Sequence, residues 1–182
     1  MGKRLPFVLA LTAVFEGIRA GSGLFRVLLD LPARFRLGPV AFAEFSRATD
    51  LSTRGIVFYV LYGFGGALLT AAAWLVASRA RASRSVRALT GAACICSALV
   101  LILTLQAAPL MWSVGSSPNE PAMLADLLDR FTFWTTLRIA CVKVSFLAIV
   151  TAMTILMLER QIPPSPLEGL ATGARPVPAK VQ

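Results

Sequence analysis

Four ionisable residues stand away from the ends of otherwise apolar stretches of this sequence. Glu16 and Arg19 interrupt the first apolar stretch, and Arg138 and Lys143 interrupt the last. A charged side chain at the centre of a bilayer costs at least about 2.5–3.5 kcal/mol, so such residues usually belong to a site or to an ion pair. They are therefore the first candidates for chemistry in this chain.

Glu16 and Lys143 are expected to lie at the same depth. Glu16 follows Leu5 by about eleven residues, roughly 16 Å of helix, and Lys143 follows Phe133 by about ten residues, roughly 15 Å. If the first and last helices are antiparallel, the two charges meet. Two interpretations remain open, a catalytic pair in a polar pocket and a structural ion pair.

Further polar residues share faces with these two. Arg19 lies three positions after Glu16 and so one turn further on the same side of its helix. Arg138 and Ser145 fall on one face of the last helix, and Tyr62 lies deep enough in the second stretch to line a cavity. An alternative for the two arginines is that their stems extend to the headgroups. We predict catalytic roles for Glu16 and Lys143 and substrate-binding roles for Arg19, Tyr62, Arg138 and Ser145.

Several classes of site are excluded by residue types. The chain contains no histidine, the commonest ligand of haem, zinc and copper. Cys94, Cys96 and Cys141 form no Cys-x-x-Cys motif and lie in apolar surroundings, as small packing residues do. No Gly-rich phosphate loop and no catalytic triad is visible. We therefore expect neither a metal nor a cofactor.

The composition indicates a membrane protein. Of 182 residues, 57% are hydrophobic and only 15% are charged, whereas a soluble domain carries about 25% charged residues. The net charge of +9 comes largely from arginines beside apolar stretches, which is typical of contact with lipid headgroups and not of nucleic-acid binding.

Four apolar stretches are long enough to cross a bilayer, at about residues 5–29, 56–77, 88–108 and 133–158. The sequence therefore predicts an all-α bundle of four transmembrane helices over residues 1–160, followed by a disordered Pro-rich tail over residues 161–182. The first stretch could also be read as a cleaved signal peptide, but its apolar character resumes beyond Ser22, which favours a retained helix.

Arginines near the stretch ends predict the orientation. Arg79, Arg81, Arg84 and Arg87 crowd the second loop, which places that loop and both termini in the cytoplasm of a plasma-membrane protein. The first loop is an exception, because Arg34, Arg36, Arg47 and Arg54 would lie outside. Within it, residues 40–49 have helical spacing after Pro39 and predict a short interfacial helix.

Some segments resemble a known family. They are Arg36-Leu-Gly-Pro-Val-Ala-Phe through Arg47-Ala-Thr-Asp50, Ala108-Pro109-Leu110, and Asp129-Arg130-Phe131 through Trp134-Thr-Thr-Leu-Arg138. Over roughly residues 5–158 the chain resembles the bacterial four-helix membrane proteins grouped with the anthrone oxygenases. The resemblance implies a cofactor-independent oxygenation of polyphenolic anthrones. Met111 stands where many members have an asparagine.

In that chemistry Glu16 would remove an acidic C–H proton, while Lys143, Arg138 or Arg19 stabilised the enolate oxygen. The expected partners are the lipid bilayer and a lipophilic small molecule, with no nucleic acid. The alternative is a non-enzymatic small transporter or a structural subunit of a membrane complex. The sequence leaves open whether the chain forms a homo-oligomer or joins another membrane protein.

Overall fold

The computed structural model describes residues 4–161, which contain helices and short turns and no strand. The helices are α1 (Arg4–Phe25), α2 (Leu31–Leu37), α3 (Pro39–Ala48), α4 (Thr53–Arg79), α5 (Arg84–Ser116) and α6 (Pro121–Gln161), and a π-helical turn, η1 (Arg26–Asp30), joins α1 to α2. The prediction of an all-α fold is confirmed. The predicted disordered tail lies outside the described residues, apart from Gln161 at the end of α6.

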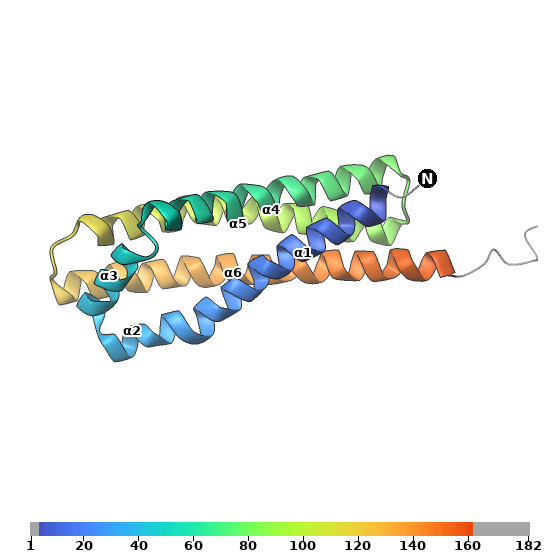
Figure 1. Cartoon of the computed structure of the whole chain (residues 1–182). Helices are drawn as coiled ribbons and strands as arrows, with labels where there is room; N and C mark the ends of the chain where they lie inside the picture. Colours follow the sequence, from blue (N-terminus) through green and yellow to red (C-terminus); the bar gives the residue numbers. More distant parts are fainter. Residues whose placement is uncertain (1–3, 162–182) are drawn as a thin grey trace, which may run out of the picture.

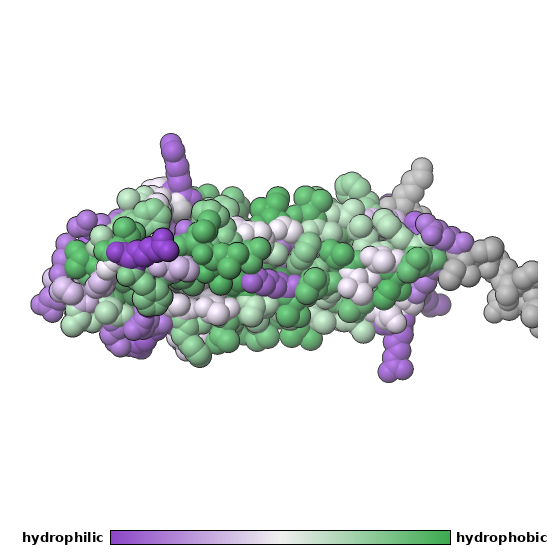
Figure 2. All heavy atoms as spheres, turned by 90° about the horizontal axis from the view of Figure 1, so that it is seen from below, coloured by the Kyte–Doolittle hydropathy of each residue, from purple (hydrophilic) through white to green (hydrophobic). Residues whose placement is uncertain are grey.

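Four helical segments are long and apolar enough to cross a membrane, namely Arg4–Leu37, Thr53–Arg79, Arg84–Ser116 and Pro121–Gln161. The shortest has 27 residues, about 40 Å of helix against a hydrocarbon core of about 30 Å. Each contains one predicted apolar stretch. Figure 2 shows the consequence at the surface, where hydrophobic side chains dominate the middle of the bundle and hydrophilic side chains gather toward its ends.

The four long helices form a ring. α1 packs against α4 and α6, and α5 packs against the same two helices. In Figure 1, α4, α5 and α6 run the length of the bundle, while α1 crosses α6 obliquely. We call one end the terminal end, where residue 4, the α4–α5 turn and residue 161 lie, and the other the α3 end, where α2, α3 and the α5–α6 turn lie.

Local chemistry explains where the helices begin and end. The Ser52 hydroxyl accepts a hydrogen bond from the Gly55 backbone N–H at 3.1 Å and caps the start of α4. Gly38 separates α2 from α3 with a φ of +78°, a backbone conformation that glycine adopts readily, and Pro39 follows at the first turn of α3. The predicted short helix is thus present as α3, and its position at the membrane interface stays a prediction.

The predicted spans at about residues 88–108 and 133–158 leave residues 109–132 between them. In the structure most of this segment is also helical, because α5 continues through Pro109 to Ser116 and α6 already begins at Pro121. A proline inside a helix removes one backbone hydrogen bond. Apolar packing offsets this loss, because buried residues on both sides of the turn, Met111 and Leu124 among them, belong to one core cluster.

Buried apolar side chains form two separate clusters. The cluster at the terminal end joins Leu5, Leu9, Ala73, Ala77, Val86, Ala93, Ala148, Ile149, Ala152 and Leu156. The cluster at the α3 end joins Phe42, Ala43, Ala107, Met111, Val114, Leu124, Leu128 and Phe131. The buried charged residues Glu16, Arg19 and Arg138 belong to neither cluster, and on α6 Arg138 lies in sequence between members of the two clusters.

Candidate functional site

A hydrogen-bonded group of four polar side chains, which we call the central polar layer, lies inside the helix ring. It consists of Glu16, Arg19, Ser97 and Ser145, each with no exposed surface. Arg19 Nη1 donates to Glu16 Oε1 and lies 3.4 Å from Ser97 Oγ. Ser97 Oγ is 3.3 Å from Ser145 Oγ. The layer therefore ties α1, α5 and α6 together with polar contacts.

The remaining helix of the ring, α4, packs against the Arg19 guanidinium. A Cβ placed on Gly66 would lie 1.8 Å from Arg19 Nη1, so only glycine leaves room for this side chain. Tyr62 donates from its hydroxyl to the Arg19 carbonyl oxygen at 2.9 Å, and its ring centroid is 4.9 Å from Arg19 Cζ. The Gly65-Gly66 pair in the sequence thus marks a close approach between two helices.

The layer is not fully satisfied. Glu16 Oε2, Arg19 Nε and Arg19 Nη2 are buried and have no hydrogen-bond partner in the described part of the chain. Buried polar groups of this kind are commonly satisfied by water.

The predicted pairing of Glu16 with Lys143 was wrong. Glu16 pairs with Arg19, and Lys143 forms no ion pair with any residue in the range 4–161. The position of Lys143 around the axis of α6 explains the difference. Val142 and Ser145 are buried on the inward face of α6, and Lys143 lies about 100° around the helix from Val142.

Two pockets lie toward the α3 end. The larger has a volume of about 400 Å³ and the smaller about 240 Å³. Both are lined by Arg26, Asp50, Tyr59 and Arg138, which we call the shared polar wall. Because these four residues belong to both linings, the two pockets adjoin one another across them, and we call the two pockets together the chamber.

Three members of the shared polar wall form hydrogen bonds with one another. Arg26 donates to both carboxylate oxygens of Asp50, at 3.2 and 2.5 Å, and also to the Tyr59 hydroxyl. Tyr59 in turn donates to Asp50 Oδ1 at 2.8 Å. The two-oxygen contact is the stronger geometry for an arginine and a carboxylate. Arg26 comes from η1, and π-turns of this kind occur frequently at functional sites.

Arg138 is the exception in this wall. Its side chain is buried, with 9% of the residue exposed, yet it makes no hydrogen bond or ion pair with any described residue. Its guanidinium carbon lies 5.7 Å from the Tyr59 ring centroid, which is a cation–π contact. Asp30, which also lines the larger pocket, has no ion-pair partner in the same range either. The chamber thus holds one cation and one carboxylate that are available to a ligand.

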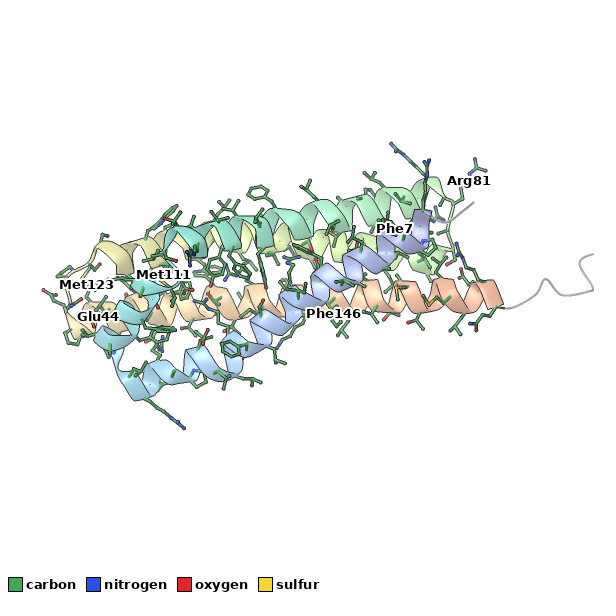
Figure 3. All side chains as sticks on the ribbon, in the orientation of Figure 1. Phe7, Glu44, Arg81, Met111, Met123 and Phe146 are labelled. Atoms are coloured by element: carbon green, nitrogen blue, oxygen red, sulfur yellow. The ribbon has the colours of Figure 1, made fainter. Side chains whose placement is uncertain are left out.

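The rest of the chamber is apolar and rich in aromatic rings. The larger pocket includes Phe25, Phe42, Phe45, Phe58 and Tyr62. The smaller pocket includes Val60, Phe64, Leu101, Met111 and Trp112. Trp112 is 61% exposed and Phe64 is 58% exposed, so the smaller pocket reaches the hydrophobic outer surface of α4 and α5. Met111 points from α5 toward the interior beside α3 (Figure 3).

The structure distributes the predicted site residues over three places. Arg138 and Tyr62 line the larger pocket. Glu16, Arg19 and Ser145 belong to the central polar layer, and neither of the two pockets is lined by them. Lys143 belongs to neither group.

Sequence reasoning missed Arg26, Asp30, Asp50 and Tyr59 as site residues. Each lies at or near the end of an apolar stretch, where charged and aromatic residues are ordinarily read as membrane flanks. Nothing in their spacing shows that η1 and the start of α4 bring three of them together.

Among residues 4–161, no cluster of His, Cys, Asp and Glu side chains could hold a metal ion. Comparison of the chain with protein-family models, with curated proteins and with solved structures found no match.

Proposed function

We propose that this chain is a multi-pass plasma-membrane protein that binds a lipophilic aromatic molecule carrying an ionised or enolisable oxygen. The ligand occupies the chamber at the α3 end, with its oxygen at Arg138 and its rings against the apolar lining. One observation carries the proposal, namely that the buried Arg138 forms no ion pair with any residue within the range 4–161.

The physical argument starts from the energy of a buried cation. An uncompensated charge away from water is strongly destabilising. Asp50 compensates the charge of Arg26, whereas the Arg138 guanidinium lines the chamber without an ion-pair partner among residues 4–161. A guanidinium presents several N–H donors in one plane and binds oxygen anions well. A ligand oxygen at Arg138 would therefore supply the interaction that the protein itself leaves unmade.

The lining and the size of the chamber support an aromatic ligand. Ligand pockets are mostly apolar with a few polar groups and have volumes of about 300–1,000 Å³. The larger pocket, at about 400 Å³, lies in this range and carries several phenylalanine rings. The resemblance to anthrone-oxygenase-like proteins points to the same class of ligand, a flat polyphenol.

With the orientation predicted from the sequence, this chamber would lie in the outer half of the membrane. Arg79, Arg81, Arg84 and Arg87 are all exposed at the terminal end, as expected for a cytoplasmic turn with both termini on that side; Arg81 points away from the bundle there (Figure 3). α3 would then lie at the outer interface.

The arginines of the first loop conflict less with this orientation than the sequence suggested. Arg34 pairs with Asp129 and donates to Thr132 at 3.0 Å. Arg47 donates to the carbonyl oxygens of Val114 and Ser117, each at 2.9 Å. Arg34 and Arg47 therefore stabilise the packing at the α3 end. Their presence in the first loop has a structural reason that does not depend on which side of the membrane the loop occupies.

Binding of a dihydroxyanthraquinone to the purified chain in nanodiscs tests the proposal. Trp112 lines the smaller pocket, so bound ligand should quench tryptophan fluorescence. Arg138→Met should weaken binding by about tenfold or more, since a hydrogen bond to a charged group contributes about 1.5–3 kcal/mol. Arg138→Lys should retain part of the affinity. Arg36→Met is the matched control, because Arg36 is an exposed arginine at the same end.

A second measurement separates a binding role from a structural role. If Arg138 exists for a ligand, its removal should leave the ligand-free protein as stable as the wild type or more stable, because an unpaired buried charge is lost. Unchanged dye affinity in Arg138→Met, or an Arg36→Met protein equally impaired, would count against the proposal.

The free carboxylate and the free guanidinium in one pocket favour a second candidate function, the oxygenation that the family resemblance implies. Asp30 would take the acidic C–H proton and Arg138 would stabilise the enolate oxygen. The carbanion would add dioxygen to form a peroxide anion, which regains the proton. Loss of water would then leave a new C=O bond.

Glu16 was the base expected from the sequence, and the two carboxylates can be compared directly. Glu16 is engaged by Arg19 and is absent from both pocket linings, so the geometry favours Asp30. Anthrone turnover should fall in Asp30→Asn and be retained in a folded Glu16→Gln protein. The opposite ranking would restore Glu16 as the base.

A further inference from the structure

Lys143 is a second cation without a carboxylate, and it lies outside the chamber. The residue is half-buried, its Nζ is not among the buried unpartnered atoms, and it makes no hydrogen bond or ion pair within residues 4–161. Its ammonium group therefore reaches the outer surface of the bundle. In the view of Figure 2, the middle section of the bundle's outer surface is mostly hydrophobic.

Contacts between α1 and α6 place Lys143 in the middle of its span. The Cβ position of Gly17 is 3.4 Å from the Phe146 ring, and that of Gly23 is 3.1 Å from Ile139. Figure 3 shows Phe146 where α1 crosses α6. Lys143 lies between Ile139 and Phe146 on α6, along the seam with α1. It is about ten residues, roughly 15 Å, from Phe133, which is further than a lysine stem reaches.

The α6 surface next to Lys143 is open. Ala140, Val144 and Leu147 are exposed, with Val144 at 52% and Leu147 at 61%. A charged residue within a membrane span is costly and normally pairs with a residue of opposite charge. No acidic side chain among residues 4–161 forms an ion pair with Lys143, so the compensating charge has to come from outside the bundle.

We propose that this face of α6, centred on Lys143, binds a transmembrane helix of another protein that carries a carboxylate near the middle of its span. A second copy of the chain does not fit this role. Glu16 is the carboxylate at the matching depth in the described spans, and it is completely buried and paired with Arg19. Asp30 and Glu159 lie about 15 Å or more along their helices from this level.

The test uses a synthetic transmembrane helix of leucine and alanine with one central glutamate, and a matched helix with leucine at that position. Both carry a fluorophore, and the labelled full chain is reconstituted with them in neutral lipid vesicles for energy-transfer measurements. The glutamate helix should associate about tenfold more strongly than the leucine helix, the scale of one interhelical polar contact in membrane peptides.

Variants assign the preference to Lys143. Lys143→Met should abolish it, and Lys143→Arg should keep it. Leu105→Met, a change at an exposed position of α5, should leave it unaltered. Lys143→Glu should transfer the preference to a helix with a central lysine.

Three results would overturn the proposal. They are an equal affinity of the wild type for both helices, a preference that survives in Lys143→Met, and self-association of the chain alone that depends on Lys143. The last would assign the face to a second copy. In native membranes, a photo-crosslinker at Val144 should attach to a transmembrane segment containing Asp or Glu. Attachment to lipid only would also contradict the proposal.

Discussion

Gly66 provides the sharpest test of how the central polar layer is built. In Gly66→Ala, the new methyl carbon would lie 1.8 Å from Arg19 Nη1, 2.3 Å from Cζ and 2.9 Å from Nε. To reach ordinary contact at 3.4 Å, the guanidinium must move by about 1.6 Å, enough to break a hydrogen bond. Arg19 is completely buried and held by Glu16, so it cannot swing into solvent.

The magnitude follows from the pair that is lost. Separating the partners of a buried ion pair costs about 3–5 kcal/mol, and replacing glycine by alanine in a helix returns about 0.5–1 kcal/mol. We therefore expect Gly66→Ala to lower the free energy of unfolding by about 2–4 kcal/mol. Reversible unfolding in mixed micelles, followed by helical circular dichroism, measures this difference.

Two comparisons make the reasoning refutable. Gly21→Ala places its methyl group where nothing lies within 4 Å, so it should be neutral or stabilising by up to about 1 kcal/mol. In a Glu16→Gln, Arg19→Met background the pair is absent, and Gly66→Ala should cost about 1 kcal/mol or less. A large cost that persists in this background would show that backbone packing, and not the ion pair, requires glycine.

Two further predictions concern the α3 end. Asp50→Asn removes the carboxylate that holds Arg26 and should cost about 2–4 kcal/mol, since both side chains are largely buried. Tyr59→Phe removes a hydroxyl that donates to this carboxylate and accepts from Arg26. It leaves the ion pair itself in place, so we expect a cost of about 1.5–3 kcal/mol, the scale of a hydrogen bond to a charged group, and thermal denaturation compares the two variants. Arg47→Ala removes donors to the carbonyl oxygens of Val114 and Ser117, so amide hydrogen exchange in residues 117–120 should accelerate while exchange in α4 stays constant. Uniform acceleration throughout the bundle would instead indicate global destabilisation.

Much of the fold was predictable because its signals are local. An apolar stretch of about twenty residues must form a helix to satisfy its backbone in lipid, and this condition is met independently in each of the four stretches. The short helix after Gly38-Pro39 was predictable for the same reason, since glycine and proline act on their own part of the backbone. The continuation of α5 through Pro109 was not, because it depends on Met111 packing against residues of α6.

The candidate site was only half predictable. Counting residues at 1.5 Å each placed Glu16 and Lys143 at one depth, and charge alone singled out Arg19 and Arg138. The shared polar wall, by contrast, combines a π-turn, a loop and two helices. Asp50 reaches Arg26 over a separation of 24 residues, and no periodic pattern encodes such a contact.

The sequence by itself therefore determined that this protein is an all-α membrane protein with four spans and that its informative charges lie in the first and last of them. The tertiary structure decided which charges meet. It paired Glu16 with Arg19, engaged Arg26 with Asp50, and left Arg138 and Lys143 without carboxylates in the described chain. The reason is geometric: helix length sets the depth of a side chain, but packing between helices sets the direction in which it points.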